Sequence, residues 1–207
     1  GSALSSAASR TSVPAWDLLL VLEFLRSRTF EPLRDASLPN LTRKALMLVL
    51  LASARRGSEV HALSGRAQDI TFERDGSITL QFCSSFVAKN QKPDQPSPVI
   101  SIQPLSSILP SGDPDLANCP VRVLRTYLSR TAPVRDPSQK LLFISLNTSR
   151  SKDIAKTTLA RWSSTLIKQA YQWWQTEGGG RSVLPLRSPR THEARAWAAS
   201  LAVLRSG

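Results

Sequence analysis

Two stretches near the start of the chain place apolar residues at helical spacing. The stretch 13-VPAWDLLLVLEFLRSR-28 has Pro14 near its first turn and a broad apolar face, which predicts a helix. The stretch 37-SLPNLTRKALMLVLLASA-54 is entered through Ser37 and Asn40 and is apolar almost all round. A helix without a polar face is typical of the centre of a core. Residues 37–54 therefore predict the central helix of the fold.

The middle of the chain has short apolar runs that predict strands. Asp75-Gly76, a strong β-hairpin signal, joins the runs 69-DITFER-74 and 77-SITLQF-82. A third strand is expected at 98-PVISIQ-103, after a long Lys/Pro/Gln-rich loop, and 141-LLFISL-146 predicts a further strand. We expect the first three to form a small antiparallel sheet.

The remaining patterns are helical. After a break at 55-RRG-57 we expect helices over 58–64, 119–131 and 155–175, and a last helix that begins near Pro189. This order of elements predicts a helix-rich α+β fold. We interpret the Ser/Ala-rich residues 1–12 as a flexible N-terminal segment and residues 13–207 as a single domain.

The charge of the chain points to a polyanionic partner. The 207 residues include 27 Lys and Arg against 15 Asp and Glu, so the formal net charge is +12. Basic side chains gain affinity for a phosphate backbone because they release its condensed counterions. Double-stranded DNA is therefore the first partner to consider. The alternative is a basic surface that serves solubility alone.

Other classes of protein fit the sequence less well. Cys83 and Cys119 lie far apart without metal-ligand spacing, so we expect neither a disulfide framework nor a metal site, and no other cofactor. The apolar run 45–54 is too short to cross a bilayer, and no secretory signal is evident, so we expect no membrane partner. These features favour an intracellular location.

Two basic clusters are candidates for phosphate chemistry. One is Arg55-Arg56; the other is His192 and Arg195, which lie three residues apart and so share a helix face. An Arg fork binds two phosphate oxygens at once, and His can donate a hydrogen bond or move a proton. Together they would stabilise the extra charge of a pentacoordinate phosphoryl-transfer transition state. In a chain this basic, the His-x-x-Arg spacing also arises without function.

Two neighbouring residues have structural interpretations. We expect Glu59 to act as a structural support that pairs with a nearby Arg, rather than as a base. His61 lies in an apolar helical context, which favours a hydrogen-bonded core histidine.

The combined motifs resemble the tyrosine recombinases of the lambda-integrase superfamily. The stretch 46-LMLVLLASARRGSEVHALS-64 resembles the segment that opens their catalytic domain, with Arg56 on the first catalytic Arg and Glu59 on the following Glu. The stretch 78-ITLQFCSSFVAKNQKP-93 is similar to their β-hairpin, whose catalytic Lys falls on Lys89, with Lys92 as the alternative. The stretch 191-THEAR-195 matches their His-x-x-Arg box.

The local sequence most resembles that of integrases of DIRS-type retrotransposons. The stretches that carry this likeness are 14-PAWDLLLVLEFL-25, 30-FEPL-33 and 118-NCPVRVLRTYLSRT-131. The resemblance covers most of residues 13–203 and implies a recombinase-like helical bundle with a small sheet. It also implies nuclear or other intracellular DNA recombination and integration on double-stranded DNA, and it permits a homo-oligomer on the DNA.

The resemblance implies a catalytic or DNA-binding role for each of the basic residues. In the family, a tyrosine hydroxyl attacks a DNA phosphodiester to form a 3′-phosphotyrosyl link, which a 5′-hydroxyl then attacks. Arg56 and Arg195 would clamp the non-bridging oxygens with help from His192, while Lys89 would protonate the departing oxygen. A plain phosphate contact is the alternative role of Lys89. Arg55, Lys92 and Arg190 would contact DNA.

The family's nucleophile has no counterpart in this sequence. It follows the His-x-x-Arg box by some tens of residues, whereas Tyr127 and Tyr171 precede the box within predicted helices, as core or groove residues. We therefore expect a truncated recombinase domain that does not cleave DNA alone. Truncation, a degenerate copy and a tyrosine from another chain all remain explanations.

Three alternative hypotheses about the function remain. The first is a non-catalytic, domesticated DNA-binding or interaction domain that retains the fold. The second is a type IB topoisomerase, which fits less well because it needs the same tyrosine and a larger clamp. The third is an unrelated basic helical protein.

Overall fold

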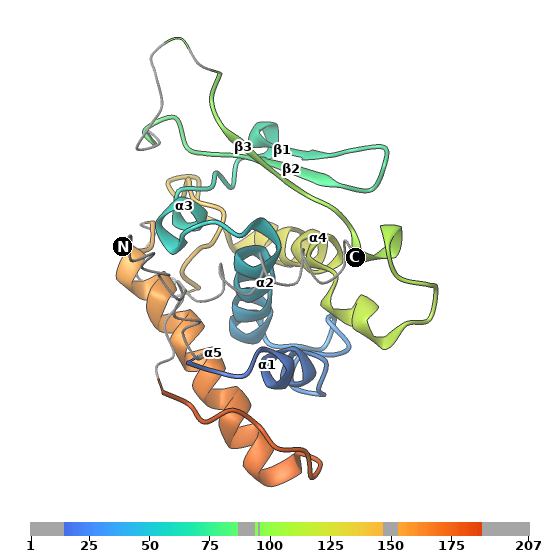
Figure 1. Ribbon diagram of the computed structural model, residues 1–207. Helices are drawn as coiled ribbons and strands as arrows, with labels where there is room; N and C mark the ends of the chain where they lie inside the picture. The colour runs from blue at the N-terminus through green and yellow to red at the C-terminus, as the bar shows by residue number, and fades with distance from the viewer. Residues whose placement is uncertain (1–14, 87–93, 95, 147–152, 188–207) are drawn as a thin grey trace, which may run out of the picture.

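Helix α2 (Leu38–Ser53) lies at the centre of the fold, with other helices around it and a small sheet across one end (Figure 1). The computed structural model describes residues 15–86, 94, 96–146 and 153–187. The other α-helices are α1 (Leu18–Leu25), α3 (Gly57–His61), α4 (Pro120–Thr131) and α5 (Lys156–Glu177). Short 3₁₀ turns occur at η1 (Ala67–Asp69), η2 (Leu105–Ser107), η3 (Pro114–Asn118) and η4 (Ala132–Val134).

Polar side chains set where the first two helices begin. The Ser37 hydroxyl accepts a hydrogen bond from the backbone N–H of Asn40 at 3.3 Å and caps α2. The helix predicted over 13–28 is shorter than expected. It begins only at Leu18, because the Asp17 carboxylate caps it by accepting the N–H of Leu20 at 3.0 Å.

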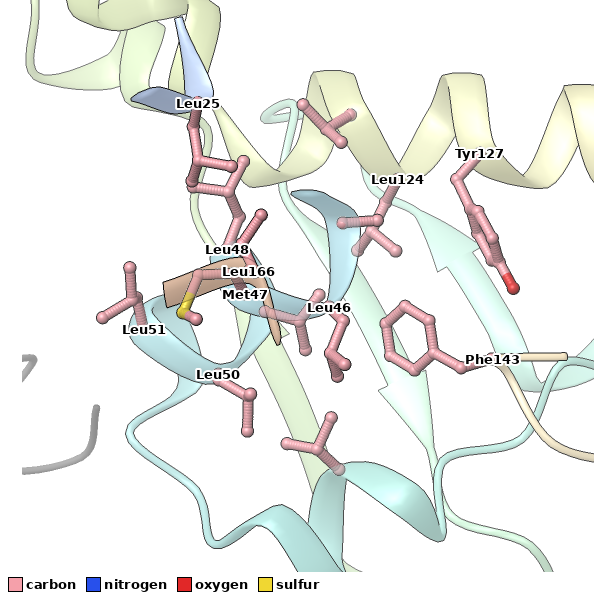
Figure 2. Close-up of a cluster of buried hydrophobic side chains, with 14 of the residues drawn as sticks. Leu25, Leu46, Met47, Leu48, Leu50, Leu51, Leu124, Tyr127, Phe143 and Leu166 are labelled. Atoms are coloured by element: carbon pink, nitrogen blue, oxygen red, sulfur yellow. The ribbon is translucent and has the colours of Figure 1, made fainter. Parts of the chain in front are cut away.

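The core forms around α2, whose residues Ala45–Leu51 are all buried. Figure 2 shows Leu46, Met47 and Leu50 of this helix among apolar side chains from α1, α4 and α5. Helix α2 packs against α4, α5 and strand β3, while α1 packs against α5. The prediction of a central helix is therefore confirmed, because an all-apolar surface is buried on every side.

Three antiparallel strands form the sheet, in the order β1-β2-β3. They are β1 (Ile70–Phe72), β2 (Ile78–Gln81) and β3 (Val99–Ile102), each within a predicted run. Gly76 in the β1–β2 turn has φ 86°, a conformation that favours glycine. Ile78 and Leu80 of the central strand are fully buried, so one face of the sheet covers the helical core. The helix-rich α+β class is confirmed.

The strand predicted at 141–146 is wrong. Leu141 makes an isolated bridge with Ser64, but side chains take the other backbone groups that a strand would pair. The Tyr127 hydroxyl donates to the Leu142 carbonyl and accepts from the Ile144 N–H, each at 3.1 Å. The Arg135 guanidinium donates to the carbonyls of Leu141 and Leu142, at 2.6 and 2.8 Å. The segment is instead an irregular connection whose residues 141–144 are buried.

Candidate nucleic-acid interface

The junction between α2 and α3 presents two adjacent guanidinium groups. Helix α2 ends at Ala54, which adopts the left-handed conformation with φ 52°. The chain then turns through Arg55 into Arg56, which is extended and precedes the first residue of α3. The N–H of Arg55 donates to the Ser53 hydroxyl at 3.3 Å, so a hydrogen bond links the last residue of α2 to this turn.

Glu59 organises this junction, as the sequence predicts. One carboxylate oxygen accepts the backbone N–H of Arg56 at 2.9 Å and so caps α3. The other oxygen pairs with the Arg55 guanidinium at 3.3 Å. The pair is partly exposed, with 41% of the Arg55 side chain and 23% of the Glu59 side chain accessible, so it contributes little to stability. Its effect is to hold the Arg55 side chain.

Arg56 differs from Arg55 because its side chain remains available. Arg56 is exposed, and no described carboxylate lies within ion-pair distance of its guanidinium. Its backbone is held by Glu59, so the side chain leaves the fold from a fixed point. An exposed guanidinium on a bonded backbone suits a phosphate contact, because its fork is pre-organised for two oxygens.

His61 connects this junction to the start of α5. Its Nε2 lies 2.6 Å from the carbonyl oxygen of Ile154, and α3 packs against α5. The ring is half-buried and satisfied, as expected for a structural histidine. The contact places the N-terminal end of α5 beside the helix that follows Arg56.

Helix α5 adds cations that the sequence analysis did not single out. The side chain of Ala155 cannot cap the helix, and the first turn of α5 has no acidic residue. Thr157, Arg161, Ser164 and Lys168 follow one another at helical spacing, and the two cations among them are exposed. Within α5 the only carboxylate is Glu177, its last residue. That absence of acidic residues was the signal in the sequence.

The base of the β2–β3 connection is also tied to α3. Leu63 bridges to Phe82, and the N–H of Cys83 donates to the Ala62 carbonyl at 2.8 Å. The rings of Phe82 and Phe86 stack with centroids 4.8 Å apart. The connection that carries the predicted lysines therefore leaves the sheet on the side where α3 docks.

Several predicted site residues lie outside the described residues. They are Lys89, Lys92, Arg190, His192 and Arg195. Of the predicted set, the structure describes Arg55, Arg56 and Glu59 and brings these three together. The meeting of Arg56 with Arg195 and His192 stays a prediction.

Both tyrosines of the sequence have engaged hydroxyls. Tyr127 is fully buried, and burial raises its pKa to about 12. The Tyr171 hydroxyl accepts the N–H of Asp17 at 2.8 Å and donates to the Leu184 carbonyl at 2.7 Å. Burial also raises the pKa of Tyr171. Both hydroxyls are therefore hydrogen-bonded within the fold.

No protein-family model matches the chain, and no curated protein matches it in sequence. Among the described residues, no group of three or more His, Cys, Asp and Glu side chains could hold a metal ion. In the same part of the chain, every helix is too short or too polar to cross a membrane.

Proposed function

We propose that the chain is the DNA-binding catalytic domain of a tyrosine recombinase, of the kind found in DIRS-type retrotransposons. The observation that carries the proposal is the state of Arg56. Its guanidinium is exposed and free of described carboxylates, while Glu59 holds its backbone N–H at 2.9 Å. Arg55, its neighbour, is paired with Glu59 instead. This is the arrangement that a phosphate clamp requires of its first Arg.

The surroundings of Arg56 support a DNA partner. Helix α5 begins beside α3 and presents Arg161 and Lys168 on an exposed face. A face with cations and without carboxylates attracts a phosphate backbone. The formal net charge of +12 acts in the same direction. We propose that duplex DNA lies across the α3–α5 side of the domain.

The remaining chemistry is assigned by resemblance. We propose that Arg195 and His192 join Arg56 around one phosphate, and that Lys89 protonates the departing 5′-oxygen. Lys92, Arg190 and, more weakly, Arg55 would contact neighbouring phosphates. An oligomer on DNA and a nuclear or other intracellular location belong to the same proposal.

The attacking hydroxyl is proposed to come from outside this sequence. Tyr127 is buried and Tyr171 is bonded on both sides, so neither can reach a DNA phosphate without rearrangement of the fold. We therefore expect the sequence alone to bind DNA without forming a covalent adduct.

Fluorescence anisotropy with a labelled duplex tests the phosphate contact. We expect log Kd to rise linearly with log salt concentration, and Arg56→Ala to lower that slope by about one phosphate contact. Arg74→Ala is the matched control, because Arg74 is exposed near the β1–β2 turn. Equal effects of both substitutions would show that only general surface charge attracts DNA, and would remove Arg56 from the proposed clamp.

A nicked suicide duplex tests the chemical step. With this sequence alone we expect no DNA–protein adduct that survives denaturation, and such an adduct would refute the assignment of the nucleophile. The full-length product of the source gene should form the adduct. In that product, Arg56→Ala should lower the yield of adduct by a larger factor than it lowers the affinity for DNA. DNA binding by that product without any adduct would favour the non-catalytic binding domain.

A further inference from the structure

An open gap lies between strand β1 and the C-terminal end of α4. Ile70 and Phe72 of β1 pair with Leu80 and Ile78 of β2, so their side chains point to the same face of the sheet. On β2 this face is fully buried, whereas Phe72 remains 37% exposed. The apolar face of β1 therefore extends beyond the helical core that covers β2.

The space beneath this overhang has the size of a binding site. Its volume is about 610 Å³, within the range of about 300–1,000 Å³ that is usual for ligand pockets. Ile70 and Phe72 form one wall, and Leu128 of α4 and Ala132, the first residue of η4, form the opposite wall. We call this space the β1–α4 groove. No described side chain fills the groove, and most of its lining surface is apolar.

The rim of the β1–α4 groove is positively charged. Arg66 is exposed and pairs with no described carboxylate. The Arg125 guanidinium, which does not itself line the groove, lies 4.1 Å from the centroid of the Phe72 ring that does. Arg135 and Asp136 also line the groove, so its lining residues carry two positive charges and one negative charge; Oδ1 of Asp136 accepts the N–H and hydroxyl of Ser138, at 2.8 and 2.6 Å. An incoming carboxylate therefore finds Arg66 available.

We propose that the β1–α4 groove docks an acidic, amphipathic segment of a partner protein. An aliphatic or aromatic side chain of that segment fills the space between Phe72 and Leu128, and an adjacent Asp or Glu pairs with Arg66. A salt bridge at this rim gives selectivity more than affinity, while the buried apolar anchor supplies most of the binding energy.

Charge and shape argue against the other occupants. Duplex DNA would match the charge of the rim, but it has no projecting apolar side chain to fill the groove. A second copy of this chain would bring a further net charge of +12 to a basic rim. The inference goes beyond the proposed function, because Arg55, Arg56 and Glu59 do not line the groove.

Peptide selection tests the proposal. A phage-displayed library of short random peptides would be selected on the full chain, and the enriched peptides would be synthesised and measured by anisotropy. We expect them to combine Leu, Ile or Phe with a neighbouring Asp or Glu. Ala132→Trp, which fills the groove from an exposed position, should weaken their binding about tenfold. Arg66→Glu should weaken the binding of the acidic peptides in the same way.

Matched variants separate the groove from general effects. Val134→Trp alters an exposed residue close to Ala132 that does not line the groove, and Arg74→Glu alters an exposed cation of the β1–β2 hairpin. Neither should change peptide binding, and circular dichroism should confirm that all four variants fold. The proposal is overturned if no peptide is enriched, if the enriched peptides lack acidic residues, or if their binding survives Ala132→Trp. It is also overturned if Ala132→Trp weakens duplex binding as Arg56→Ala is expected to, since the groove would then be a nucleic-acid surface.

Discussion

A buried ion network between α1, α2 and α4 makes an asymmetric prediction about stability. Lys44 of α2 is fully buried, and its Nζ donates to the Leu25 carbonyl at 2.8 Å and to Glu31 Oε1 at 2.7 Å. Glu31 also accepts two hydrogen bonds from Arg122, at 2.8 and 2.9 Å. One carboxylate thus balances two cations. We predict that Glu31→Gln destabilises the fold more than Lys44→Met does.

The magnitudes follow from what each substitution leaves behind. Glu31→Gln keeps the side-chain shape but leaves the Lys44 ammonium buried without a counter-charge, a loss of about 3–5 kcal/mol in comparable sites. Because 18% of the Glu31 side chain is exposed, we expect the lower end, about 3 kcal/mol. Lys44→Met leaves Glu31 paired with Arg122 and orphans only the Leu25 carbonyl, which costs about 1–2 kcal/mol.

Urea unfolding followed by tryptophan fluorescence measures these differences. For a domain of this size, the Glu31→Gln change corresponds to a fall in Tm of about 6–12 °C. The double variant Glu31→Gln/Lys44→Met should be less destabilised than the sum of the single variants, because the uncompensated charge is absent. The reasoning is refuted if Lys44→Met is the more destabilising substitution, or if the two effects add.

The same network sets a pH dependence. Burial raises the pKa of Glu31, but hydrogen bonds from Arg122 and Lys44 outweigh it and leave this pKa below the ordinary value of 4.5. A carboxyl group whose pKa is lower in the folded state stabilises the fold above its unfolded pKa, and this contribution is lost as the pH falls through the folded value. The difference in unfolding free energy between wild type and Glu31→Gln should therefore narrow below pH 4.5.

Three further substitutions, one of them with a matched control, test other contacts of the fold. Burial raises the pKa of Asp17, but its backbone hydrogen bonds and Arg181 outweigh burial and leave this pKa below 3.8. Asp17→Asn should therefore destabilise the fold at neutral pH, and the destabilisation should disappear in acid. Urea titrations at both pH values measure it. Tyr127→Phe should cost about 1–3 kcal/mol in urea unfolding, because it leaves the buried N–H of Ile144 without a partner and removes one of the two side-chain donors to the Leu142 carbonyl. Gly65→Ala should lower Tm by several degrees, because its Cβ would lie 2.5 Å from a guanidinium nitrogen and 2.5 Å from a backbone oxygen. Gly57→Ala is the control: its Cβ would meet nothing within 4 Å, so Tm should stay nearly unchanged.

Part of the candidate site follows directly from sequence. The Arg-x-x-Glu spacing predicts that Glu59 supports a nearby Arg, and the carboxylate indeed contacts both Arg55 and Arg56. Which Arg is held and which is left free could not be predicted, because it depends on the left-handed turn at Ala54. The cations of α5 became part of the candidate surface only when the contact between His61 and Ile154 placed that helix beside α3.

The sequence by itself determined the elements whose signals are local. The largely apolar helix α2, its polar entry at Ser37 and the Asp75-Gly76 turn each appear in the structure where the pattern predicts them. These signals are reliable because they depend on residues within one or two turns of each other.

The tertiary structure decided everything that depends on a distant partner. Residues 141–146 have the composition of a strand, yet Tyr127 and Arg135 bind their backbone groups and exclude a neighbouring strand. The β1–α4 groove likewise exists because the apolar face of β1 is less covered than the paired face of β2, which no local pattern reports. Backbone hydrogen bonds and apolar faces must be satisfied somewhere, but only the packed chain selects the group that satisfies them.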